Sequence, residues 1–214
     1  MRKLSVFTIL LAGLFFVGCQ ESSTKSSSSS ESSCHTCFTL DETQQVVVEK
    51  PKREGVYHFA TEDTQVYSSD GSKVIGSVIK GYGFAEVKEQ GDKVILKAVG
   101  YIKDGDSLNI YADEDFILPA ITLKEGSVVK DMEVAIPKAK LTKTESEIWS
   151  KSEFIYYDNC SMCHAAHSPK EHTIQEWEGV YGTMKAFAMP TEEDDKLIWE
   201  YLRSHSKGSF ALDE

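Results

Sequence analysis

The chain is short of basic residues. Its 214 residues include 23 Lys and Arg against 34 Asp and Glu, which gives a formal net charge of −11. Nucleic acids are bound mainly through clustered positive charge that faces their phosphate groups. The acidic balance therefore argues against a nucleic-acid partner, and it favours a protein partner that presents basic residues.

A long apolar run is lacking as well. The apolar run Leu4–Val17 near the start is too short for a membrane-spanning helix, and it follows a short basic start as in a secretory signal. Its end, Phe16-Val17-Gly18-Cys19, resembles the lipobox of bacterial lipoproteins, in which the cysteine becomes the lipid-carrying first residue. We expect residues 1–18 to be a signal peptide. We expect Cys19 to anchor the chain to a lipid bilayer of the cell envelope, inner or outer, facing the periplasm.

Cysteine is sparse, but its spacing is informative. The chain has five cysteines. Cys19 stands alone, and the other four form two Cys-x-x-Cys pairs, the second of which is followed by a histidine in Cys160-Ser161-Met162-Cys163-His164. Two thiols at this spacing match the two vinyl groups of a haem, and the histidine that follows supplies a nitrogen to the iron. We expect one covalently bound haem c on Cys160 and Cys163, with His164 as an axial iron ligand.

The second axial ligand decides whether such a site transfers electrons or binds gases. A methionine thioether raises the potential of the iron, and a second imidazole lowers it. Met184 closes the apolar stripe of a predicted helix, Met189 stands just after that helix, and His172 lies at its start. His167 is only three residues from His164, so we expect it to be a surface residue. Met184 is favoured, with Met189 and His172 as the alternatives.

The first cysteine pair, Cys34 and Cys37, lies in a serine-rich stretch. Residues 19–54 are predicted to be a flexible tether because their composition cannot form a core. No histidine follows Cys37, which argues against a second haem, and no other free pair remains for a four-thiolate zinc site. A disulfide, redox-active thiols and metal binding all stay open for this pair.

Residues 55–143 have the alternating pattern of short strands separated by turns. The predicted strands lie at 56–59, 64–67, 73–79, 84–88 and 93–102, and residues 117–134 are predicted to supply a second, similar β unit. Their order resembles bacterial SH3-like modules. We expect a small all-β, SH3-like domain that serves as a scaffold or docking module.

Residues 144–214 change to a helical period. Thr144 with Glu147 and Thr173 with Glu176 have the form of capping boxes, and Thr191 precedes an acidic first turn. A region this small has little core of its own, and a haem would supply the missing apolar surface. We therefore expect a small all-α cytochrome c domain after the β domain, in a multidomain chain.

This last stretch is similar to the monohaem C-terminal domain of the cytochromes that serve trimethylamine-N-oxide and related S- and N-oxide reductases. The matching segments are Cys160-x-x-Cys163-His164, His167-x-Pro169-x-Glu171-His172-Thr173, Trp177-x6-Met184 and Tyr201-Leu202-x-x-His205. The resemblance implies Met184 as the second iron ligand. It also implies a periplasmic molybdenum reductase as electron acceptor and a membrane quinol-oxidising cytochrome as donor. Unlike the long members of that family, this chain has one haem motif and no multihaem segment.

Taken together, these features predict an electron-transfer protein and not an enzyme. It would pass single electrons to a terminal respiratory reductase of the N-oxide or S-oxide type. Two other functions stay open at this point. One is a haem-based redox or ligand sensor, and the other is an envelope scaffold protein that carries an accessory haem.

Overall fold

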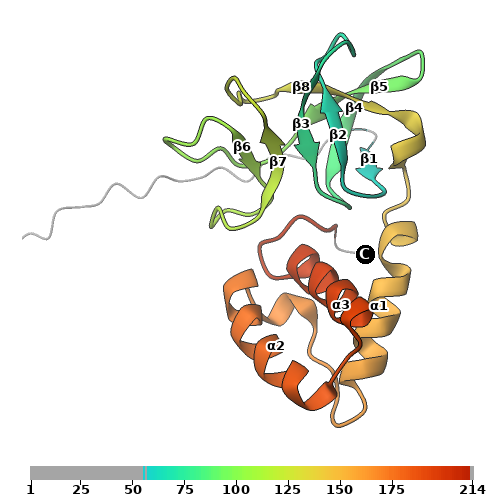
Figure 1. The fold of residues 1–214 in the computed structure, drawn as a ribbon, viewed down its shortest axis with the longest axis vertical. Helices are drawn as coiled ribbons and strands as arrows, with labels where there is room; N and C mark the ends of the chain where they lie inside the picture. Colours follow the sequence, from blue (N-terminus) through green and yellow to red (C-terminus); the bar gives the residue numbers. More distant parts are fainter. Residues whose placement is uncertain (1–54, 56, 213–214) are drawn as a thin grey trace, which may run out of the picture. The chain divides into compact units, whose positions relative to one another are not determined.

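A computed structural model describes residues 55 and 57–212 (Figure 1). Strands fill the first part of this region and helices the last part. The strands are β1 (Tyr57–Ala60), β2 (Thr64–Tyr67), β3 (Val74–Val78), β4 (Gly83–Gln90), β5 (Lys93–Ala98), β6 (Asn109–Tyr111), β7 (Pro119–Leu123), β8 (Glu133–Pro137) and β9 (Leu141–Thr142). The helices are α1 (Ser146–Cys160), α2 (Ile174–Ala188) and α3 (Glu192–His205), with short 3₁₀ turns at η1 (Lys138–Lys140) and η2 (Pro169–Glu171).

All nine strands belong to one antiparallel sheet with the order β6-β7-β3-β2-β8-β5-β4-β1-β9. The predicted strands of residues 56–102 are confirmed to within a few residues. The later strands do not form a second unit. Strand β7 pairs with β3, and β8 lies between β2 and β5, so the region 117–134 completes the same sheet.

The predicted fold class, a small SH3-like domain followed by a small all-α cytochrome c domain, is wrong. The described residues all belong to one compact unit, in which the sheet and the helices share a single hydrophobic core. Trp149 of α1 lies against Gly81, and the ring of Tyr82 contacts that of Phe210 at a centroid distance of 6.0 Å. Lys80 also forms an ion pair with Glu200 at 3.4 Å. Local periodicity identified the elements, but it carries no information about which apolar faces meet.

The starts of the helices agree with the sequence in two cases out of three. The side chain of Thr173 accepts a hydrogen bond from the backbone N–H of Glu176, and the side chain of Glu176 accepts one from the backbone N–H of Thr173. The predicted capping box of α2 is therefore confirmed. Thr191 caps α3 as expected. The predicted box at Thr144 is wrong, because the N-cap of α1 is Glu145 and no side chain caps it.

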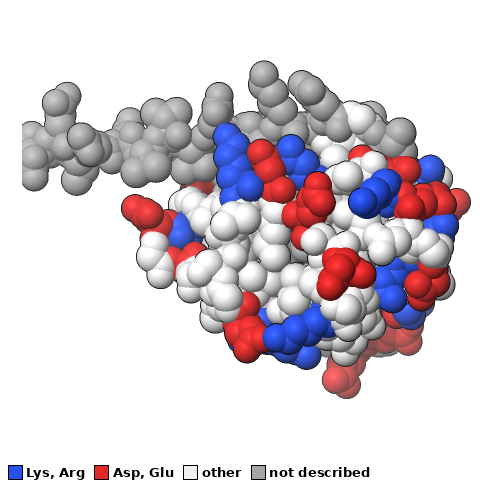
Figure 2. Space-filling model, turned by 90° about the horizontal axis from the view of Figure 1, so that it is seen from above, with Lys and Arg blue, Asp and Glu red and all other residues white. Residues whose placement is uncertain are grey.

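The charged surface is mixed. On the face that Figure 2 shows, acidic and basic side chains are interspersed and form no patch of a single sign. Ion pairs such as Lys138–Glu89 and Lys97–Asp131 join exposed side chains. Exposed pairs of this kind contribute little to stability, typically below about 1 kcal/mol each.

Among residues 55 and 57–212, none of the helices is long and apolar enough to cross a membrane.

Candidate functional site

Helix α1 brings the Cys-x-x-Cys-His motif to the helical part of the core. Trp149 and Tyr156 are buried on one face of α1, and Cys160 follows Tyr156 by one turn on that face. Cys160 is accordingly half-buried, and burial raises the pKa of its thiol. Cys163, in the turn after the helix, is exposed. Neither cysteine is in a disulfide, so both thiols are available for covalent attachment.

The ring of His164 uses one nitrogen in a hydrogen bond and keeps the other available for a metal. Its Nδ1 lies 2.7 Å from the carbonyl oxygen of Ala165, and because a carbonyl only accepts, Nδ1–H must be the donor. The lone pair of a neutral imidazole is then on Nε2, the nitrogen that binds metals when Nδ1–H is held by a carbonyl. His164 itself is exposed.

The loop between α1 and α2 is held by hydrogen bonds from neighbouring helices. Tyr156 donates to the carbonyl oxygen of His167 at 2.6 Å, and the indole of Trp177 donates to that of Pro169 at 2.8 Å. Within the loop, Nδ1–H of His167 donates to Glu171 at 2.7 Å, which holds the pKa of that carboxyl below its usual value. His167 is exposed, as expected, although it has this partner.

Helix α2 carries the favoured methionine on its buried face. Ile174, Trp177 and Tyr181 point into the core, and Met184 follows Tyr181 on the same stripe. The side chain of Met184 is 39% exposed, so it lies at the edge of that core. Met189 is 80% exposed and caps the helix with φ +45°, in the left-handed region that non-glycine residues rarely adopt.

Aromatic side chains fill the space between the three helices. Tyr156 packs edge-on against Trp177 at 6.4 Å and lies 5.7 Å from Tyr201, while Tyr181 stacks on Trp199 at 6.1 Å. Burial raises the pKa values of the Tyr156 and Tyr181 hydroxyls, and Asp195, which accepts a hydrogen bond from Tyr181 at 2.7 Å, adds to the second shift. The helical spacing of Tyr156, Tyr181 and Tyr201 predicts that these side chains face inward, and all three are buried.

The helical part keeps unusually many large apolar side chains at its surface. Those between residues 154 and 189 are Phe154, Tyr157, Met162, Met184, Phe187 and Met189. Three of them, Phe154, Tyr157 and Met162, line one hollow, and contiguous exposed apolar surface marks binding sites in soluble proteins. Together with two free thiols and an imidazole with an available Nε2, this donor set fits a planar apolar macrocycle with a central iron.

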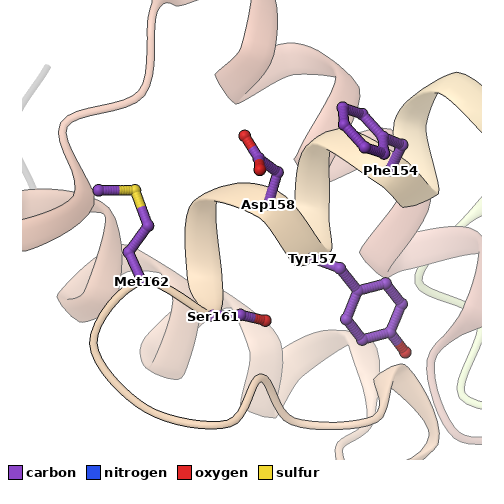
Figure 3. Close-up of a pocket in the computed structure, with 5 residues that line it drawn as sticks. All are labelled: Phe154, Tyr157, Asp158, Ser161 and Met162. Atoms are coloured by element: carbon purple, nitrogen blue, oxygen red, sulfur yellow. The ribbon is translucent and has the colours of Figure 1, made fainter.

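An open hollow of about 450 Å³ borders the motif along the C-terminal half of α1. Figure 3 shows its lining side chains, Phe154, Tyr157, Asp158, Ser161 and Met162, arranged along the helix and the turn that follows. Met162 stands between the two cysteines, so this partly apolar hollow and the motif share one stretch of surface.

The structure brings most of the predicted site residues into one short region. Cys160, Cys163 and His164 are consecutive parts of one turn, and His172 lies at the end of the loop that follows. His172 packs edge-on against Trp177 at 4.9 Å, which accounts for it without an iron. The predicted lipidation at Cys19 and the pair Cys34 and Cys37 lie outside the described residues and stay predictions.

In comparisons with known proteins, no family model, no curated protein and no solved structure matches this chain.

Proposed function

We propose that this chain is a lipid-anchored envelope protein that carries one covalently bound haem c and passes single electrons to a terminal reductase. The observation that carries the proposal is the motif at the end of α1, where Cys160 and Cys163 are free thiols and His164 keeps Nε2 available. Bound haem supplies a one-electron iron couple, so no side chain has to act as a catalyst.

The residues of this chain have separate tasks in the proposal. The S–H groups of Cys160 and Cys163 would add across the two vinyl groups of the haem, which forms two thioether bonds and releases nothing. His164 would bind the iron through Nε2, and Met184 would supply the second ligand. The apolar side chains at the edge of the helical core would shield the haem from water, which favours the less charged, reduced iron.

The resemblance to the domain that serves N-oxide and S-oxide reductases supports a molybdenum reductase of that type as acceptor and a membrane quinol-oxidising cytochrome as donor. The acidic net charge supports a partner with a basic docking surface. The partly apolar hollow beside Met162 supports docking next to the motif. A lipid on Cys19 would keep the chain near a membrane donor.

A reoxidation assay tests this function. Reduced mature protein is mixed with a purified N-oxide or S-oxide molybdenum reductase, and the haem spectrum is followed before and after the oxide substrate is added. Rapid reoxidation that needs both the reductase and its substrate supports the donor function. A haem that stays reduced with every reductase of this class contradicts it.

A haem-based ligand sensor is the second candidate, and the exposure of both methionines favours it. Met184 is 39% exposed and Met189 80% exposed, so an exogenous ligand has access to a thioether held at the surface. Fast formation of a ferrous carbon monoxide spectrum at neutral pH would favour the sensor. Slow or absent formation would favour the electron donor.

A further inference from the structure

Three potential metal ligands lie together in the loop that follows the haem motif. The ligand atoms of His167, Glu171 and His172 all lie within 4.8 Å of one another. They stand on and beside the short turn η2, and neither His167 nor Glu171 has a part in the function proposed above. Two imidazoles and one carboxylate form a donor set that suits divalent first-row transition metals.

The carboxylate of Glu171 is already held next to His167 by hydrogen bonds. The Oε1 atom of Glu171 accepts a hydrogen bond from the backbone N–H of Ser168 at 2.8 Å in a capping box, which fixes the side chain. Its Oε2 atom then lies 2.7 Å from Nδ1 of His167. In a tetrahedral zinc site with bonds of about 2.0–2.2 Å, neighbouring ligand atoms are about 3.4 Å apart. The distance between Oε2 of Glu171 and Nδ1 of His167 therefore has to increase by less than about 1 Å when zinc binds.

The backbone under these ligands is held by all three helices. The carbonyl oxygen of His167 accepts from Tyr156 of α1, and that of Pro169 accepts from Trp177 of α2. The carbonyl oxygen of His172 accepts from the backbone N–H of Lys207, just after α3, at 2.8 Å. A loop fixed in this way loses little conformational entropy when its side chains take up an ion.

The cluster is also open to solvent. The side chains of His167 and Glu171 are 46% and 50% exposed, and that of His172 is 28% exposed. The rings of His167 and His172 have centroids 5.8 Å apart and an interplanar angle of 58°, so they do not stack. An ion can therefore reach the cluster, and water can fill a remaining coordination position.

We propose that His167, Glu171 and His172 form a binding site for one divalent transition-metal ion of the zinc type. The ion takes the place of the proton that His167 Nδ1 shares with Glu171, and that proton is released to solvent. Since the ion engages His172, this residue is no longer available as a second haem ligand. The site stands apart from the haem proposal and does not depend on it.

Calorimetric titration with Zn²⁺ tests the site. Tag-free, chelator-treated mature protein is first treated with iodoacetamide, so that any unmodified cysteine thiol is blocked. We expect one saturable site that takes one Zn²⁺ per chain. His167→Ala, Glu171→Gln and His172→Ala should each weaken the affinity by at least about tenfold, the scale at which even outer-shell changes act.

The Glu171→Gln variant is the sharpest of the three because glutamine also serves in a capping box, so the turn keeps its shape while the charge is lost. Glu178→Gln, on the exposed side of α2, is the matched control and should bind Zn²⁺ like the parent. Absence of saturable binding in the parent would overturn the proposal. Equal Zn²⁺ affinities of the parent and Glu171→Gln would also overturn it. The same holds if His172→Ala binds Zn²⁺ as tightly as the parent does.

Discussion

At the scale of single residues, Met184 and Met189 are two candidates for the second iron ligand of the proposed haem. Met184 continues the buried stripe of Trp177 and Tyr181, whereas Met189 stands beyond the end of α2 with a largely exposed side chain. A ligand has to project from a fixed element to hold a metal in one geometry. Met184 therefore stays the proposed second iron ligand, with Met189 as its alternative.

A pair of variants tests this preference. Met184→Ala should remove the long-wavelength thioether-to-iron band of the ferric protein and lower its reduction potential, because a thioether favours reduced iron. Met189→Ala should leave both unchanged. The measurement is a potentiometric titration with optical spectra. The opposite pattern, with the band lost only in Met189→Ala, would move the ligand to Met189.

A second residue-scale feature is the carboxylate of Asp106, which closes the loop before β6. It accepts hydrogen bonds from the hydroxyl of Tyr111 at 2.6 Å, the amide side chain of Asn109 at 2.9 Å and the backbone of Leu108 at 2.9 Å. These donors lower the pKa of Asp106 from 3.8 to about 2, with Tyr111 as the largest cause. The hydrogen bond to Asp106 in turn raises the pKa of the Tyr111 hydroxyl above its usual value.

The stability contribution of Asp106 should depend on pH in one direction. Because the folded pKa lies below the unfolded one, the contribution is complete above about pH 4 and is lost as the pH falls toward about 2. Asp106→Asn should therefore be less stable than the parent at pH 7 and match it near pH 2. Urea unfolding at both pH values measures this, with Asp104→Asn as the control. A difference that persists unchanged at pH 2 would contradict the assignment.

At the scale of elements, the close approach between Gly81 and Trp149 joins the sheet to α1. Gly81 has φ +79°, and a Cβ atom there would lie only 2.1 Å from a ring carbon of Trp149. The indole is held in place by Lys80, whose Nζ lies 5.0 Å from its centroid, and by His205, whose ring meets it edge-on at 5.3 Å. A side chain at position 81 would thus push the helix and the sheet apart.

Gly81→Ala should destabilise the protein more than backbone strain alone explains. Left-handed strain costs about 1–2 kcal/mol, and overpacking against the indole adds about 1–3 kcal/mol. Gly105→Ala is the matched control, because Gly105 has φ +82° with no heavy atom within 4 Å of the added Cβ. Urea unfolding gives the two free energies. Equal losses in the two variants would show that the contact with Trp149 carries no energy.

The sequence predicted individual elements better than their ends and partners. The capping box at Thr173 formed as predicted because its two residues are local to each other. The similar pattern at Thr144 did not cap α1. There Thr142 donates to Glu147, so the glutamate of the expected box is bonded to the end of β9 instead. Thr142 and Thr144 are both close to Glu147 in the chain, so the capping-box pattern alone does not say which threonine the glutamate will bond to.

At the scale of the whole molecule, the same limitation explains the wrong fold class. The sequence of β8 contains a short apolar run, Val134 to Ile136, but nothing in it specifies insertion between β2 and β5, strands far apart in the chain. Likewise, the periodicity of α1 predicts that one face of the helix is buried, but it does not predict what that face packs against. In the structure, Trp149 on this face packs against Gly81. For the candidate site, the motif and the helix of Met184 could be predicted. The hydrogen-bonded loop with Glu171 could not, because its supports come from three separate helices.

Since the sheet and the helices share one core, they should unfold together. All three tryptophans lie in the helical part, so their fluorescence reports on the helices, and hydrogen exchange of β5 and β8 reports on the sheet. We expect both signals to change at the same urea concentration. If the tryptophan fluorescence changed at a clearly lower urea concentration than the exchange of the strands, the helices and the sheet would be independent domains. That result would contradict the shared core.

The central claim is that one haem is covalently attached through Cys160 and Cys163, and the mass of the intact chain tests it most directly. The mature protein is produced in cells that mature c-type cytochromes, extracted with acid and organic solvent, and weighed beside the Cys160→Ala, Cys163→Ala double variant. We predict that the parent retains the mass of one haem after extraction and that the double variant retains none. A parent chain without bound haem, or with haem that the solvent removes, would contradict the claim.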